Sequence, residues 1–247
     1  MAHPALRGAV SIPSAPLLVD GVGVGGGPAV QQLRDSVRRM AGRLPDSDVI
    51  VLVAAGQPAL HDTAVVDLTG LGYPDHTREL PGCSPAIAAL SRITQYPRVR
   101  RPRLPLDLAV LALLVDRATP VVAMEVSASA EFSVLTALGT SVVQALTETG
   151  LSGSIVAAGD LSAGLHDGSP LAARNGAREW DAQVVEAFTR GRPGDLADLG
   201  PARATDVGAR GWAPLSVLHG AAASASLTLR VRRYTAPRGV GYLLLAA

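Results

Sequence analysis

The sequence predicts an α/β protein with one mostly parallel, mixed sheet and helices on both of its faces. Short runs of Val, Ile and Ala alternate along the chain with longer amphipathic segments. These runs are apolar at every position, as strands covered on both faces must be, and the chain ends in two strand-like runs around a turn. With 247 residues, 48% of them hydrophobic, the chain is long enough to form a single domain over residues 1–247.

Four segments have the character of buried strands. In chain order they are residues 8–13, 48–55, 119–126 and 153–159. Gly, Pro or Asp stands at or next to their ends, which is typical of strands that lead into loops. The long segments between them favour parallel pairing, because a parallel connection needs a crossover of a dozen or more residues.

Amphipathic periodicity predicts helices between these strands. The first covers residues 27–44, with Pro28 suited to its first turn, and the second covers residues 129–150 and ends at Gly150. Their apolar faces are made by Val30, Leu33, Val37 and Met40 in the first, and by Phe132, Leu135, Leu138, Val142 and Leu146 in the second.

The last quarter of the chain changes character. Residues 191–211 are rich in Gly, Pro and Asp and predict a short helix with connecting loops. A helix at about 212–223 follows, and residues 226–246 predict a β-hairpin around the turn 236–239, which would close one edge of the sheet. The apolar run 104–115 is explained equally well by a core helix and by the face of a homo-oligomer.

Composition limits the partners and the compartment. The net charge is +1, every basic residue is Arg and only 3% of residues are aromatic, so no nucleic-acid partner is expected. A single cysteine, Cys83, excludes an internal disulfide and any cysteine-based metal site. The amino terminus lacks a signal-peptide pattern and no apolar run is long enough for a membrane span, so the expectation is a cytoplasmic protein with no membrane partner.

Familiar local motifs are incomplete. The glycine-rich segment 21–27 lacks both the dinucleotide fingerprint and the Lys-Ser/Thr of a P-loop, so a loop without nucleotide is expected. The serine in "DLSAG", Ser162, does not stand in the Gly-x-Ser-x-Gly context of a hydrolase nucleophile. The histidines never occur at a local metal-binding spacing; they are His3, His61, His76, His166 and His219.

The segment 154–188, "SIVAAGDLSAGLHDGSPLAARNGAREWDAQVVEAF", resembles one in class III extradiol ring-cleavage dioxygenases of the catalytic B-subunit (LigB) type. In that family a strand ends in Gly-Asp-Leu-Ser-His and leads through a loop into a helix. Residues 8–26, 46–62 and 236–246 resemble the family's first, second and closing strands. The resemblance implies a LigB-like three-layer fold.

The departures from the family bear directly on activity. The family holds ferrous iron with two histidines and a carboxylate and uses a further histidine as acid–base. Its three histidines fall here on Ser14, Gly56 and Ala163, of which the last is the acid–base position, and Asp206 is the best match for the carboxylate. Gly and Ala have no donor atom, so the resemblance implies a pseudoenzyme without a cofactor.

The predicted role is therefore non-catalytic binding of an unknown small molecule or protein in the cleft at the carboxyl ends of the strands. The residues expected to line that cleft are Ser14, Gly56, Gln57, His61, Asp160, Ser162, Ala163 and His166. The alternative is an active Fe(II)-dependent ring-cleavage dioxygenase or other oxidoreductase with relocated ligands, His61, His166 and Asp206. Glu125 could join such a site, although an ion-paired structural role is the first expectation for it. A structural subunit is the third alternative.

Overall fold

The computed structural model describes residues 5–23 and 27–247, so His3 and residues 24–26 of the glycine-rich segment lie outside the described residues. The strands are β1 (Leu6–Ile12), β2 (Val49–Ala55), β3 (Ala59–His61), β4 (Ala64–Leu68), β5 (Tyr73–Leu80), β6 (Arg98–Val99), β7 (Val121–Val126), β8 (Gly153–Ala158), β9 (Arg230–Thr235) and β10 (Tyr242–Ala246). The α-helices are α1 (Gly27–Gly42), α2 (Ser84–Thr94), α3 (Leu106–Val115), α4 (Phe132–Thr149), α5 (Ala177–Thr189), α6 (Leu196–Asp206) and α7 (Trp212–Ser224).

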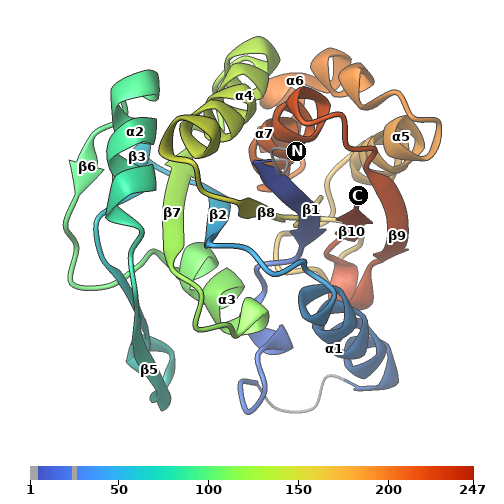
Figure 1. Cartoon of the computed structure of the whole chain (residues 1–247). Coiled ribbons are helices and arrows are strands. Elements are labelled where there is room, and N and C mark those ends of the chain that lie inside the picture. Colours follow the sequence, from blue (N-terminus) through green and yellow to red (C-terminus); the bar gives the residue numbers. More distant parts are fainter. Residues whose placement is uncertain (1–4, 24–26) are drawn as a thin grey trace.

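Eight strands form one mixed sheet in the order β6-β3-β7-β2-β8-β1-β10-β9 (Figure 1). The central strands β7, β2, β8 and β1 are parallel to one another, and they are the four that the sequence predicts. The predicted C-terminal hairpin, β9 and β10, closes the β1 edge by antiparallel pairing. The α/β fold class, the mostly parallel sheet and the hairpin are therefore confirmed.

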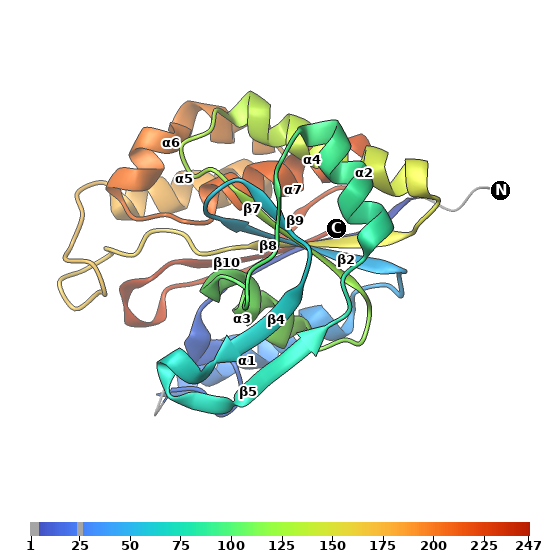
Figure 2. The same cartoon turned by 90° about the vertical axis from the view of Figure 1, so that its left-hand side faces the viewer.

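Helices cover both faces of the sheet. Figure 2 shows α2, α4, α5, α6 and α7 on one face, and α1, α3 and the separate β4–β5 hairpin on the other. Side chains along β2 point alternately into the two apolar clusters between these layers: Val51 belongs to the first cluster and Leu52 to the second. Both faces of the central strands are thus buried, which explains why their sequences are apolar throughout.

The run 104–115 is a core helix. Along α3, six residues are buried against the sheet and only its first residue, Leu106, is strongly exposed, at 42%. The core-helix alternative therefore accounts for most of this run, since most of its apolar side chains are covered within the chain.

Residues 59–99 contain the elements that the sequence did not predict: the short strands β3 and β6, the β4–β5 hairpin and α2. The β5 sequence, YPDHTREL, is mostly polar, which suits a strand that lies outside the main sheet and is largely exposed. Within the described part of the chain, no helix is both long and apolar enough to cross a membrane.

Candidate functional site

A cleft of about 680 Å³ opens at the carboxyl ends of β2 and β7. Its walls come from four places in the chain. These are the end of β2 with the two residues after it, β7 with the loop that follows it, the start of α3, and Arg210 in the loop before α7. The lining residues are Ala54, Ala55, Gly56, Gln57, Pro105, Leu106, Asp107, Glu125, Ala128 and Arg210. Parallel strands that end side by side place these loops together.

Glu125 is the most buried charged residue of the cleft. Its side chain is 7% exposed, and its Oε2 atom lies 3.1 Å from Nε2 of His61 and 3.4 Å from a guanidinium nitrogen of Arg101. Burial lowers the pKa of His61, which favours a neutral ring whose Nε2–H donates to the carboxylate. The expected ion-paired role of Glu125 agrees with these contacts, while the same carboxylate also faces the cleft.

The Glu125 carboxylate occupies the space in which a side chain at position 56 would lie. A Cβ atom placed on Gly56 would lie 1.9 Å from Oε1 of Glu125, far closer than two non-bonded atoms can approach. Oε1 accepts no hydrogen bond from any described residue, so it is open on the cleft side. A side chain at position 56, histidine included, would therefore require Glu125 to leave its place beside His61.

Arg210 also lines the cleft. Its guanidinium donates to the Asp107 carboxylate at 2.6 and 3.0 Å and to the backbone carbonyl of Ala55 at 3.2 Å. These bonds connect the loop before α7 to the start of α3 and to the end of β2. The cleft is thus lined by the Arg210–Asp107 ion pair and by the buried Glu125 carboxylate.

Ser14 and Asp160 meet where β1 and β8 end. The backbone N–H and the hydroxyl of Ser14 both donate to Oδ2 of Asp160 at 2.7 Å. Burial raises the pKa of Asp160 to about 6, with a smaller rise from the nearby Asp107 charge and a partial offset by the Ser14 hydrogen bonds. The Ser14 hydroxyl donates its only proton to this bond, and a neutral hydroxyl is a poor metal ligand beside imidazole.

Ser162 does not line the cleft, and this expectation is wrong. It is fully buried, and both its N–H and its hydroxyl donate to Oδ1 of Asp181 on α5. The other oxygen of Asp181 accepts a hydrogen bond of 2.7 Å from Tyr234. Ser162 is therefore part of a buried network that fixes the loop after β8 against α5 and β9.

The relocated metal site is not formed either. His61 is buried against Glu125, whereas His166 is exposed in the loop after β8 and Asp206 is exposed at the end of α6. No group of three His, Cys, Asp or Glu side chains within residues 5–23 and 27–247 is placed to hold a metal ion. The ferrous iron of the resembling family does not fit Ser14, Gly56 and Ala163 either, since only the first of them has a side-chain donor.

Of the eight residues expected in the cleft, Gly56 and Gln57 line it. Ala163 instead packs beside the α6–α7 loop, where its N–H donates to the Val207 carbonyl at 3.1 Å. The sequence reasoning missed Asp107 and Arg210, which carry no local signal because they meet only in the folded chain. Glu125 did have a signal, since it is a charged residue inside an apolar strand.

Comparison with known proteins gives a fold and no family. No family model matches the chain, and no curated protein matches it. The solved structure of an uncharacterized protein, JW3007, from Escherichia coli K12 has a TM-score of 0.67 and 15% sequence identity, over 97% of this chain and 99% of that one. At this identity the likeness is one of fold, and it extends over essentially the whole of both chains.

Proposed function

We propose that this chain is a non-catalytic, LigB-like binding protein that holds a small molecule in the cleft at the ends of β2 and β7. The fold class and the resemblance of residues 154–188 support the LigB-like part of the proposal. The single buried cysteine, Cys83, favours a reducing compartment such as the cytoplasm.

One observation carries the proposal: the Glu125 carboxylate occupies the space in which a side chain at position 56 would stand. In the resembling family that position supplies an iron-binding histidine. Here His61 and Arg101 anchor a carboxylate in its place, and the oxygen that faces the cleft is left without a partner among the described residues. The arrangement keeps a concave site and replaces a metal ligand by an acceptor for a bound molecule.

The chemistry of the cleft selects the class of ligand. Oε1 of Glu125 is free to accept hydrogen bonds from a ligand and favours a cationic donor. Ala54, Pro105 and Leu106 supply apolar contact. Arg210 pairs with Asp107, and Arg101 contacts Oε2 of Glu125, so neither guanidinium occupies Oε1. A small primary amine with an apolar body fits these features, whereas an anionic catecholate would meet the Glu125 charge.

Calorimetric titration of the full chain with a set of small primary amines, and with their N-acetylated counterparts, tests the proposal. We expect an amine to bind and its neutral counterpart to bind at least tenfold more weakly. Glu125→Gln should weaken the amine at least tenfold, and the exposed Glu179→Gln, which has no ion pair with a described residue, should not. Ala128→Trp narrows the cleft without removing a hydrogen bond and should also weaken binding.

A parallel measurement addresses catalysis. Protein reconstituted anaerobically with Fe(II) should keep well below one equivalent of iron and should consume no oxygen with catechol. Stoichiometric iron that is lost in a His61→Ala, His166→Ala double variant, together with oxygen uptake, would overturn the non-catalytic assignment. Failure of every amine to bind, or binding that is indifferent to both Glu125→Gln and Ala128→Trp, would overturn the assignment of the cleft.

A further inference from the structure

A second cavity, of about 540 Å³, lies on the face of the sheet that α1 covers, between α1 and the β9–β10 hairpin. Its apolar lining includes Val10 of β1, Met40 of α1 and Leu244 of β10. Four arginines line it as well, Arg39, Arg43, Arg232 and Arg233, and no Asp or Glu side chain does. It has no residue in common with the cleft at the ends of β2 and β7.

A β-bulge brings two of these arginines to the cavity. Leu244 pairs with Arg233 and Leu245 with Val231, so Arg232 is an extra residue without a partner on β10. Val231 accordingly packs toward the α5 and α7 side, while Arg233 reaches α1 on the other side and Arg232 lines the same cavity. In a regular strand two consecutive side chains would point to opposite faces, and the bulge is what allows both to face one cavity.

The hydroxyl of Ser36 holds two guanidinium groups close together. A nitrogen of Arg39 on α1 and a nitrogen of Arg233 on β9 each donate to Ser36 Oγ at 3.1 Å. The hydroxyl in turn donates to the Gln32 carbonyl at 2.8 Å, and Arg233 also donates to the Gln32 side-chain oxygen at 3.2 Å. The two cations are therefore fixed by neutral groups, which orient them without neutralising their charge.

No Asp or Glu side chain of the described residues compensates the charge of the cavity, although Ala247, the last residue of the chain, brings its backbone carboxylate to the lining. Elsewhere, arginines such as Arg38 and Arg117 pair with carboxylates, but none of the four cavity arginines pairs with a carboxylate side chain in the described part of the chain. Arg43 and Arg232 have no side-chain hydrogen bond with any described residue. Like charges that converge without a counter-ion repel one another, and a bound multivalent anion removes that repulsion.

We infer that this cavity binds a small phosphorylated organic molecule, with the phosphate held by the four guanidinium groups and the organic part on the apolar floor. A phosphate monoester carries close to two charges and three terminal oxygens, which suits several arginines better than a single carboxylate does. The volume is within the range of sites for molecules of nucleotide size. This site is independent of the proposed function of the cleft.

Calorimetric titration of the full chain with adenosine 5′-monophosphate, ribose 5-phosphate, inorganic phosphate and adenosine tests the inference. We expect both phosphate esters to bind, adenosine to bind at least tenfold more weakly than its monophosphate, and the affinity of the esters to fall as salt rises. Inorganic phosphate should bind more weakly than the esters, because it cannot use the apolar floor.

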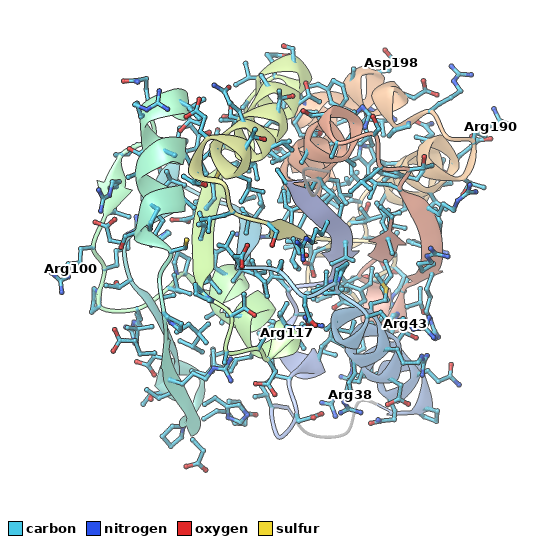
Figure 3. All side chains as sticks on the ribbon, viewed as in Figure 1. Arg38, Arg43, Arg100, Arg117, Arg190 and Asp198 are labelled. Carbon is cyan, nitrogen blue, oxygen red and sulfur yellow. The ribbon has the colours of Figure 1, made fainter. Side chains whose placement is uncertain are left out.

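The informative variant is Arg43→Gln, Arg232→Gln, since neither side chain supports the fold through an ion pair or hydrogen bond with a described residue. It should weaken both esters at least tenfold. The matched control is Arg100→Gln, Arg203→Gln, which removes the same charge from two exposed arginines that lie outside the cavity and likewise form no ion pair within residues 5–23 and 27–247. Figure 3 shows Arg43 beside α1 and Arg100 on the far side of the molecule.

Ser36→Ala gives a second test, because it frees Arg39 and Arg233 without changing the charge, and it should weaken the esters several-fold. No binding of either ester at millimolar concentration, or an equal loss in the control variant, would overturn the inference. Tight binding of a single-stranded oligonucleotide with none of the monophosphate would also overturn it and would indicate a nucleic-acid surface instead.

Discussion

At the scale of single residues, three buried or half-buried carboxylates lie in or near the loops that follow the central strands: Glu125 in β7, Asp160 after β8 and Asp181 on α5. Asp160 accepts two hydrogen bonds from Ser14, and Glu125 is held by His61 and Arg101. Asp181 accepts bonds from Ser162 and Tyr234, and burial raises its pKa. Each carboxylate joins segments that are distant in the chain, so each has a structural role whether or not it also meets a ligand.

Asp160 should make the stability of the protein depend on pH. Its pKa rises from 3.8 to about 6 on folding, so its ionised form is disfavoured in the folded state. The stability associated with this residue is therefore fully present below about pH 4 and is lost as the pH rises through about 6. By the pKa difference the total change is roughly 3 kcal/mol.

Asp160→Asn should remove this dependence. In urea unfolding measured from pH 4 to pH 8, the stability of the variant relative to the wild type should rise with pH by roughly 2–3 kcal/mol. Other titrating groups, His61 among them, are present in both proteins and cancel in the difference. The exposed Asp198→Asn serves as control, and a flat difference for Asp160→Asn would contradict the prediction.

At the scale of elements, α4 and α7 pack with their backbones in direct approach. A Cβ atom on Gly139 of α4 would lie 2.1 Å from the Val217 carbonyl oxygen, and one on Gly220 of α7 would lie 2.1 Å from the Thr136 carbonyl oxygen. Glycine inside a helix costs about 1 kcal/mol relative to alanine. Here that cost is offset because the two helix backbones can approach each other directly.

Gly139→Ala should therefore destabilise the protein by about 3 kcal/mol or more, since the added methyl group has backbone rather than a flexible side chain as its neighbour. Gly42→Ala, at the end of α1 with no atom within 4 Å of the new methyl group, should be neutral or slightly stabilising. Thermal unfolding followed by circular dichroism measures both. Similar melting temperatures for the two variants would contradict the packing shown between α4 and α7.

At the scale of the whole molecule, the sequence predicts the parts in which local pattern and burial agree. The four central strands, α1, α4, α7 and the C-terminal hairpin follow from periodicity and turn residues. The β4–β5 hairpin could not be predicted in this way, because polar side chains dominate β5 and its pairing is decided by tertiary contacts. The same limit applies to the sites: Gly56 and Gln57 follow a recognisable strand end, whereas Asp107 and Arg210 are brought together only by folding.

The two faces of the sheet should unfold together, because the same strands supply both apolar clusters. Both tryptophans, Trp180 and Trp212, lie in the cluster under α4, α5 and α7, while Leu108 of α3 is fully buried in the other cluster. Leu108→Ala should cost about 2–5 kcal/mol through the cavity it leaves. If the sheet couples the faces, tryptophan fluorescence and far-ultraviolet circular dichroism should report the same shift in urea midpoint, although the substitution is on the face without tryptophan.

Leu106→Ala in the same helix, at a 42% exposed position, should shift neither signal appreciably. A circular dichroism midpoint that falls while the fluorescence midpoint stays would mean that the α1–α3 layer unfolds on its own.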